Sequence, residues 1–377
     1  MDRFRSEPTR TEANLRAFMV LRLHGTVLPD GDDRDVYVVD GRLTFDHDGD
    51  AETVLDGGFI TPGLVDVHAH LALASPAPEP ASPEEASRAS ARQQLDAGVL
   101  AVREPGSPHY GSVGIGPADG LPRTFSAGRF LAPPDGGYIP GLARGVPPDA
   151  LADAAHEELS RGGGGWAKVI GDWIRPGRGI RPNYPADALA AAANRVHDAG
   201  GRIAIHASLA EVLLDAIEAG FDSIEHCTGL TEDGVARIAE SGVTLVPTLS
   251  IYSSLPGMLG QVGVPHNEID EMAHAIERLP AMLRLADDAG VRVLAGTDAG
   301  MGPHGRIVGE ILLLAEAGFS ATTAMGAGSW TAREFLGLPG IEEGAPADLV
   351  AFGRDPCSDL SVLSEPAVVV LDGKRVR

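Results

Sequence analysis

The sequence has few cysteines, a deficit of positive charge and no long apolar run. Its two cysteines, Cys227 and Cys357, cannot build a disulfide framework, which favours a reducing compartment and hence the cytoplasm. The formal net charge of −23 argues against nucleic acid or an anionic membrane as a partner, because both would repel the chain. No window holds about 18 consecutive apolar residues, and the N-terminus lacks the apolar core of a signal peptide.

The remaining composition is that of an ordinary globular protein. Hydrophobic residues make up 44% and charged residues 22% of the 377 positions, which suffices for one large domain and a smaller one. The glycine run at residues 162–165 lacks the lysine and Ser/Thr of a phosphate-binding loop, so we interpret it as a tight turn. The function has to be found in other motifs.

A repeated unit runs through the middle of the chain. Alanine-rich, helix-like segments end at a glycine, and a short apolar run such as RIAIH or VTLVPT follows. Glycine after a helix suits the left-handed C-terminal cap, and apolar strands that alternate with helices predict a parallel sheet. The runs end in polar residues at a nearly constant distance, since Gly200 and His206 are six residues apart, as are Gly220 and His226, while Gly290 and Asp298 are eight apart.

Eight candidate strands within residues 61–336 predict an α/β fold of the (β/α)8 TIM-barrel type, in preference to a doubly wound open sheet. The candidates are residues 64–70, 99–105, 122–128, 166–172, 202–207, 222–227, 244–250 and 291–298. Polar residues at the C-terminal ends of such strands form the active site of a barrel enzyme.

The two ends of the chain have a different pattern. VYVVDGRLTF near the start and VVVLDGKRVR at the finish each place Asp-Gly between apolar runs, which is a strong hairpin signal. We therefore predict a small flanking β-sandwich domain that is built from residues 16–60 and 337–377. Residues 1–15 are predicted to form a polar N-terminal arm.

The run LVDVHAHLAL, residues 64–73, carries two histidines, His68 and His70. Because side chains alternate along a strand, both imidazoles face the same side. Two buried imidazoles are costly without a partner, and a metal ion is such a partner. A pair of surface or hydrogen-bonded histidines is the alternative, because an isolated H-x-H motif is weak evidence.

Four further polar residues stand at predicted strand ends: Lys168, His206, His226 and Asp298. Each of three has a structural explanation when taken alone: His206 as a core histidine, Asp298 as a helix cap and Lys168 as a paired cation. If the barrel closes, all of them meet His68 and His70 at one mouth. The joint arrangement indicates a metal site.

Several motifs resemble the amidohydrolase superfamily of metal-dependent hydrolases over nearly the whole chain: TPGLVDVHAHL, AKVIGD, IAIHA, IEHC, LAGTDAG and GIEEGAPADLVAFGRDP. Within it the pattern is similar to the prolidase and imidazolonepropionase-like group, with Tyr138 where a histidine is common. The resemblance implies two divalent metal ions, with zinc expected, and a carboxylated Lys168 as the bridging ligand. It assigns His68, His70 and Asp298 to one metal, and His206 and His226 to the other.

The resemblance also implies an activity. We expect a hydrolase that cleaves the C–N bond of a small substrate, such as a dipeptide or an N-acyl amino acid. The nucleophile would be a metal-bridging hydroxide, with Asp298 as general base and then acid. Candidate substrate-binding residues lie in or beside segments at the mouth: Tyr138, Arg103, Tyr252, His304 and Arg306. A homo-oligomer is compatible with this interpretation.

Three alternatives remain at this stage. A lactone or phosphotriester hydrolase can share the ligand set, although such relatives usually lack a flanking β domain. A one-metal deaminase or cyclic-amide hydrolase is disfavoured by Lys168, because a lysine bridge serves two metals. A catalytically inactive assembly protein is disfavoured because all six ligand positions are intact.

Overall fold

The computed structural model describes residues 20–73, 82–175, 177–253, 255–261 and 264–377. The predicted N-terminal arm, residues 1–15, lies outside these ranges. Among the helices of the described residues, none combines the length and the apolar character that a membrane crossing requires.

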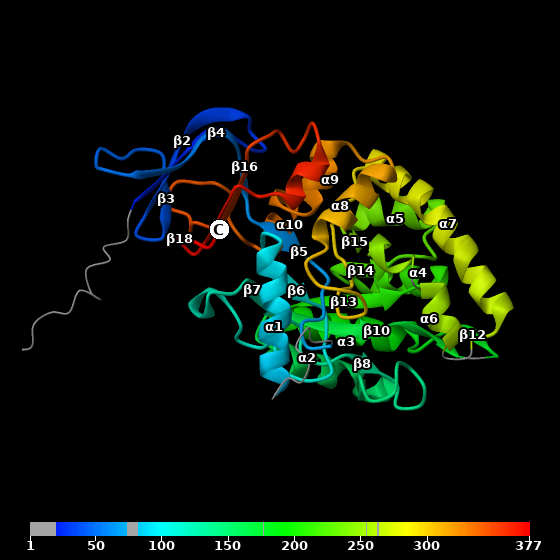
Figure 1. Ribbon diagram of the computed structural model, residues 1–377. Coiled ribbons are helices and arrows are strands. Elements are labelled where there is room, and N and C mark those ends of the chain that lie inside the picture. The colour runs from blue at the N-terminus through cyan, green and yellow to red at the C-terminus, as the bar shows by residue number, and fades with distance from the viewer. Residues whose placement is uncertain (1–19, 74–81, 176, 254, 262–263) are drawn as a thin grey trace, which may run out of the picture.

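Both ends of the chain contribute to one seven-stranded sheet, in the order β18-β17-β16-β4-β1-β2-β3. The strands are β1 (Leu21–Val27), β2 (Asp32–Val39), β3 (Arg42–Thr44), β4 (Glu52–Pro62), β16 (Leu349–Phe352), β17 (Val368–Leu371) and β18 (Lys374–Arg375). Figure 1 shows this sheet at one end of the molecule, where the blue N-terminal strands lie beside the red C-terminal ones. A second sheet, which the predicted sandwich needs, is not confirmed, since these described strands form one sheet; the domain bounds stay a prediction.

Alternating burial explains how this sheet holds together. Strand β1 buries every second residue, so that Leu21, Leu23 and Val27 share one face with Val36 and Val38 of β2. The two predicted hairpins are confirmed, because β2 pairs with β3 and β17 pairs with β18 in antiparallel register. Both turn pairs have positive φ: 49° and 82° in Asp40-Gly41, and 49° and 77° in Asp372-Gly373. This conformation matches the twist of a two-residue hairpin.

The remaining large sheets are parallel and carry the site. Their orders are β5-β6-β7 and β15-β14-β13-β10-β8-β9. Their strands are β5 (Leu64–Asp66), β6 (Val99–Glu104), β7 (Arg123–Ser126), β8 (Leu131–Ala132), β9 (Arg144–Gly145), β10 (Trp166–Ile170), β13 (Arg202–Ala207), β14 (Ser223–His226) and β15 (Thr244–Val246). A separate hairpin, β11 (Asp172–Arg175) and β12 (Gly179–Pro182), follows β10.

Seven of the eight predicted inner strands are present, and the eighth is not. Residues 291–298 form no strand, although Leu294 N donates to Leu245 O at 2.9 Å and Val67 N donates to Ala295 O at 3.1 Å. Gly296 passes so close to β5 that a Cβ on it would lie 2.6 Å from the His68 Cβ, and Asp298 has a φ of 54°. This close approach and the irregular backbone interrupt the regular hydrogen-bonded strand pairing of residues 291–298. The structure therefore has the predicted parallel α/β layout without a continuous closed barrel among the described residues.

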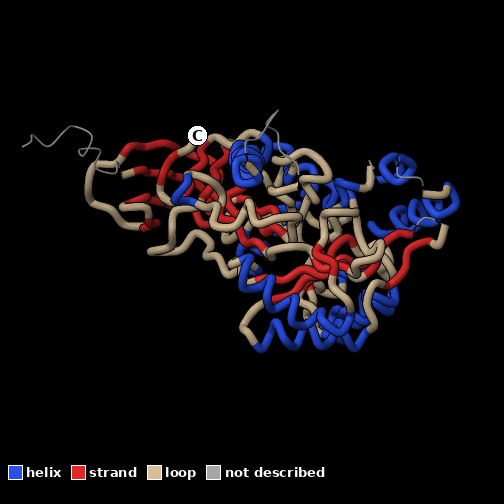
Figure 2. Tube along the Cα trace, turned by 90° about the horizontal axis from the view of Figure 1, so that it is seen from below, coloured by secondary structure: helices blue, strands red, loops and turns tan. Residues whose placement is uncertain are grey.

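Helices connect and cover the parallel strands, and Figure 2 shows a row of them along the outside of the strands. They are α1 (Pro83–Asp96), α2 (Leu151–Gly162), α3 (Ala186–Asp198), α4 (Ala210–Ala219), α5 (Glu232–Ser241), α6 (Leu255–Gln261), α7 (His266–Asp288), α8 (Ile307–Glu316), α9 (Ala321–Ala327) and α10 (Trp330–Phe335). The predicted glycine caps are confirmed at Gly220 and Gly242, which end α4 and α5 in the left-handed conformation. Because each helix returns the chain to the same edge, successive strand ends collect on one side.

The two hairpin turns touch each other, and this contact yields a test. A Cβ on Gly373 would lie 2.2 Å from the Gly41 Cα, whereas a Cβ on Gly31 would meet nothing within 4 Å. Both Gly373 and Gly31 have positive φ, so alanine is strained at either position. We expect Gly373→Ala to lower the free energy of unfolding by roughly 1–3 kcal/mol more than Gly31→Ala, because only the first also overpacks. Urea unfolding measures both, and equal losses would contradict the role of the contact.

Candidate functional site

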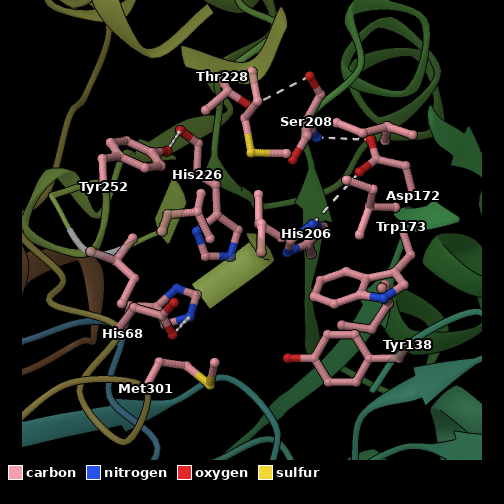
Figure 3. A pocket seen from close by; sticks show the side chains of 18 of the residues that line it. His68, Tyr138, Asp172, Trp173, His206, Ser208, His226, Thr228, Tyr252 and Met301 are labelled. Carbon is pink, nitrogen blue, oxygen red and sulfur yellow. Dashed lines mark hydrogen bonds and ion pairs between the residues drawn. The ribbon is translucent and has the colours of Figure 1, made fainter. Parts of the chain in front are cut away.

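All six predicted ligands line one cavity at the C-terminal ends of the parallel strands. They are His68, His70, Lys168, His206, His226 and Asp298. Figure 3 shows His68, His206 and His226 gathered around the same space. The pairing of β10, β13 and β14 sets this arrangement, because Ile170 lies beside His206 and Ala207 lies beside His226.

His68, His70 and Asp298 form a compact triad. The two histidine Nε2 atoms are 3.2 Å apart, and the Asp298 Oδ1 lies 3.0 Å from the His70 Nε2 and 3.4 Å from the His68 Nε2. One ligand atom from each residue lies within 4.8 Å of the others. All three side chains are buried. Three donors that converge in this way fit a divalent metal ion such as zinc.

The other ring nitrogens of this triad already have partners. The His68 Nδ1 lies 2.6 Å from the Glu225 Oε2, and the His70 Nδ1 lies 2.8 Å from the Gly106 carbonyl oxygen. Both partners are acceptors, so each Nδ1 donates and each Nε2 keeps its lone pair for a ligand. Burial lowers the pKa of His70 below its ordinary value, which keeps that ring neutral.

His206 and His226 form a second pair beside the triad. Their ring centroids are 4.5 Å apart, and the His226 Nδ1 is hydrogen-bonded to the Thr248 hydroxyl at 2.8 Å. The His206 Nε2 faces the Asp172 Oδ1 at 3.6 Å, which is beyond hydrogen-bond distance. Burial lowers the pKa of His226 to about 3 and that of His206 well below its ordinary value. Both imidazoles are therefore neutral at pH 7 and able to coordinate.

Lys168 stands out because its amine is buried without a hydrogen bond. The side chain is 1% exposed, and its Nζ has no hydrogen-bond partner among the described residues. Burial lowers the pKa of Lys168 to about 8, although the charge of Glu225 opposes the shift. An orphaned buried polar atom calls for an explanation, and an added group on the nitrogen is one that fits.

Backbone strain collects at the same strand ends. Four residues that are not glycine have left-handed φ there: His226 at 70°, Cys227 at 60°, Thr248 at 51° and Asp298 at 54°. Each such conformation costs on the order of 1–3 kcal/mol and persists only where the surroundings impose it. Strain of this kind is common at functional sites. There it lets a side chain point into the site in a direction that a regular strand conformation would not allow.

The buried ion pair between Arg103 and Glu225 supports the triad, because Glu225 is also the partner of the His68 Nδ1. The Arg103 Nη2 lies 2.8 and 2.9 Å from the two oxygens of Glu225, and both side chains are fully buried. Burial alone would raise the pKa of Glu225, but Arg103, Lys168 and His68 hold it well below its ordinary range. The Arg103 Nε also donates to the Val67 carbonyl oxygen at 2.6 Å. Glu225 thus stays ionised as the acceptor for His68.

This position corrects one sequence-based expectation. Arg103 does not line the cavity and is fully buried, so it lies behind His68 rather than at the mouth. The guanidinium is occupied by Glu225, Ser223 and a backbone carbonyl, which leaves no donor aimed at a substrate. Strand β6 is buried on both faces, and a cation there has to be paired inside the protein.

The other candidate substrate residues divide into two groups. Tyr138 and Tyr252 line the cavity. Tyr252 donates its hydroxyl to the carbonyl oxygens of His226 and Pro247, at 2.7 and 3.0 Å, while Figure 3 shows the Tyr138 hydroxyl directed into the cavity. His304 and Arg306 do not line it: His304 is buried elsewhere and Arg306 is exposed at the start of α8.

Sequence reasoning missed three carboxylates that position the site. Asp66 accepts the backbone N–H of His68 at 3.2 Å and the Thr297 N–H and hydroxyl at 3.1 and 2.6 Å, which ties the first strand to Asp298. Glu225 holds His68, and Asp172 faces His206. One signal was available: each is an acid within or directly after an apolar run, in LVDVHAH, DSIEHC and WAKVIGD. A buried acid in such a run needs a partner.

Comparison with known proteins agrees with this geometry. The sequence profile of the Amidohydrolase family matches residues 59–376. The chain belongs to the amidohydrolase family. An uncharacterized protein of Mycobacterium tuberculosis (strain ATCC 25618 / H37Rv) is 39% identical over 358 residues, which cover 94% of this amidohydrolase and 95% of that protein. The prediction of a hydrolase of this type is confirmed, and the family implies divalent metal ions and a small-molecule substrate.

Solved structures share the fold of this amidohydrolase. One is a Xaa-Pro dipeptidase with bound methionine in the active site, with a TM-score of 0.80, 22% identity, and coverage of 95% of this chain and 100% of that chain. Another is a prolidase complexed with N-methylphosphonate-L-proline, with the same TM-score of 0.80, 22% identity and the same coverage of 95% and 100%. At this identity the likeness concerns the fold.

The contact between His68 and Glu225 yields a prediction about metal affinity. In Glu225→Gln the amide keeps the shape but removes the charge that favours donation from the His68 Nδ1. We expect zinc affinity to fall by roughly 10- to 100-fold, as is usual when the outer partner of a metal-binding histidine is lost. Competition with a chelating dye measures the change.

Glu158→Gln is the matched control. Glu158 is equally buried but is bonded to Tyr110, Arg144 and the Arg129 N–H, away from the cavity. An equal loss of zinc affinity in both variants would mean that general destabilisation, rather than support of His68, explains the effect.

Proposed function

We propose that this amidohydrolase binds two divalent metal ions, with zinc as the expected metal, and hydrolyses a C–N bond of a small substrate. The observation that carries the proposal is the convergence of four histidines, a lysine and an aspartate on one cavity. Depressed pKa values at His70, His206 and His226 support it, because they leave lone pairs available at neutral pH. Dipeptides and N-acyl amino acids remain the predicted examples of substrate.

Each ligand has a part in this proposal. His68, His70 and Asp298 would hold one metal, and His206 and His226 would hold the other. The neutral amine of Lys168 would add to carbon dioxide, form an N–C bond as one C=O π bond opens, and release a proton, and the resulting carbamate would serve as a ligand for both metals. Bound metal ions of this kind lower the pKa of water and polarise a carbonyl group.

Protein side chains handle the proton and the oxyanion. Asp298 accepts a proton from the attacking water and delivers it to the leaving nitrogen, as general base and then acid. Burial alone would raise the pKa of Asp298, but the neighbouring His68 and His70 hold it well below its ordinary range, so the carboxylate starts ionised. The Tyr138 hydroxyl stabilises the oxyanion. Burial raises the pKa of Tyr138, so the phenol keeps its proton and remains a donor.

The alternatives are less well supported. A lactone or phosphotriester hydrolase usually lacks a flanking β domain, and this chain has a seven-stranded sheet made from both ends. A one-metal deaminase or cyclic-amide hydrolase gives no use for a buried, unpaired Lys168. An inactive assembly protein gives no reason to keep six ligand-type side chains around one cavity.

Metal content tests the bridging role of Lys168. We expect about two zinc ions per chain in protein that is expressed with zinc and purified without a chelator, and about one or fewer in Lys168→Ala, because a bridging ligand serves both sites. The same variant should lose most of its turnover. Lys374→Ala is the matched control, since Lys168 and Lys374 are the only two lysines and Lys374 lies in exposed β18. Two metals and near wild-type turnover in Lys168→Ala would refute the bridge.

The pH dependence of carbamate formation tests the same residue independently. Only the neutral amine reacts with carbon dioxide, so a pKa of about 8 makes the reaction faster as the pH rises. At constant dissolved carbon dioxide, we expect the rate on metal-free protein to rise roughly 25-fold from about pH 6.5 to about pH 8.5. Carbon-13 NMR with labelled carbon dioxide follows the carbamate signal, and Lys168→Ala gives the background. A signal that persists unchanged in Lys168→Ala would assign it to another amine.

A further inference from the structure

One wall of the cavity is aromatic, and the six ligand-type residues form its polar floor. Phe130, Tyr138 and Trp173 stand side by side, with ring centroids 5.2 Å apart between Phe130 and Tyr138 and 4.5 Å apart between Tyr138 and Trp173. All three line the cavity, and Figure 3 shows Trp173 close to Tyr138 on one side of the histidines. A wall of this kind packs well against a flat or bulky apolar group.

A second wall, which meets the first at Trp173, is aliphatic. Ile174 and Ile180 are paired across the β11–β12 hairpin, and they pack with Leu255 and Leu259 of α6 and Met272 of α7 in one cluster. All five line the cavity, and Ile174 and Leu259 are only 9% and 8% exposed. The substrate group that enters between these walls therefore leaves water for an apolar surrounding.

Positive charge is scarce in this cavity. Lys168 is the only lysine or arginine among the described residues that line it, and Lys168 belongs to the proposed metal centre. Of the ranges outside the description, 74–81, 176, 254 and 262–263 contain no lysine, arginine or histidine, whereas residues 1–19 contain four arginines. Among the described residues, a substrate carboxylate beside the scissile bond would have no cation to pair with, apart from Lys168 and the metals themselves, and an unpaired buried carboxylate is strongly disfavoured.

Three arginines lie outside the cavity, in a neighbouring groove. Arg178, Arg181 and Arg278 line this groove together with Glu268 and Glu271, and none of the three lines the cavity. All three arginines are exposed. The groove adjoins the cavity, with which it shares Ile174, Ile180, Ser208, Thr228 and Met272. None of its three arginines lines the cavity itself.

Resting on the proposed function, we propose that the substrate is an uncharged amide with an aromatic or branched aliphatic group beside the scissile bond. It carries no carboxylate on the carbon that is bonded to the scissile nitrogen. The net charge of −23 works in the same direction, because it repels anionic substrates on approach. The proposal therefore excludes the two examples of substrate predicted from the sequence, because dipeptides and N-acyl amino acids both carry such a carboxylate.

Matched substrate pairs test the proposal on the zinc-loaded protein. N-benzoyl-leucine and N-(3-methylbutyl)benzamide differ only in the carboxylate, as do Met-Pro and methionylpyrrolidine. We expect kcat/KM to be at least roughly 100-fold higher for the member of each pair that lacks the carboxylate, because the apolar walls penalise that buried anion. A preference for the carboxylate-bearing members would overturn the inference and leave the proposed C–N hydrolysis intact. If neither pair is cleaved while a lactone or phosphotriester is, the proposed function itself is wrong and the inference falls with it.

Binding to metal-free protein gives a readout that does not depend on turnover. Calorimetry on metal-free Lys168→Ala, which removes the cation that itself lines the cavity, should show tighter binding of N-(3-methylbutyl)benzamide than of N-benzoyl-leucine. Tighter binding of the carboxylate in the absence of metal would reveal a cation that serves the cavity, for example from residues 1–19, which contain four arginines, and would overturn the inference.

A new cation in the aliphatic wall should weaken the selectivity against the carboxylate. Met272 is partly buried on α7 and lines the cavity, so Met272→Arg places a guanidinium where a substrate carboxylate would need one. We expect the ratio of kcat/KM for N-benzoyl-leucine over N-(3-methylbutyl)benzamide to rise roughly 10-fold or more. His274→Arg is the control, because His274 is exposed on the same helix and lines neither the cavity nor the groove. An equal rise in both variants would attribute the change to overall charge and count against the inference.

Discussion

The buried ion pair between Arg103 and Glu225 is the interaction on which the site depends. Both side chains are fully buried, and removing one partner of such a pair typically costs about 3–5 kcal/mol, because the other charge is left uncompensated. A buried ion pair contributes little net stability, because apolar side chains that fill the same space would stabilise the protein as well or better. Its use is that Glu225 remains an ionised acceptor in an apolar interior. That acceptor selects the tautomer of His68 and so directs its Nε2 toward His70 and Asp298.

The same logic extends around the cavity. Asp66, Thr248 and Asp172 act on His68, His226 and His206 in turn, and each engages a backbone or ring position that leaves a ligand atom facing inward. Burial depresses the pKa values of the imidazoles, so protons do not compete for these atoms near neutral pH. The cost appears as left-handed backbone at His226, Thr248 and Asp298. Preorganisation is thus distributed over several partners, of which Asp172 lines the cavity while Asp66 and Thr248 do not.

The walls and the floor of the cavity come from different kinds of segment. The floor consists of residues at the ends of parallel strands, whose positions follow from the sheet. The walls come from the β11–β12 hairpin, from α6 and α7, and from the segment that carries Phe130 and Tyr138. Connecting segments vary more freely than strands do, which is why a shared ligand set is compatible with different substrates.

The sequence by itself indicated the alternation of helices and parallel strands, the two Asp-Gly hairpins and the six ligand-type residues among those that line the cavity. Local rules suffice for these features, because glycine caps, alternation and apolar runs act over a few residues. The sequence did not determine that residues 291–298 depart from a regular strand, since this follows from the close approach of Gly296 to His68. Only the tertiary structure decided that Arg103 lies behind His68, outside the cavity, and that apolar side chains form the walls of the cavity. Arg103 and Glu225 are 122 positions apart, and only the folding of their two strands against a common core brings these charges together.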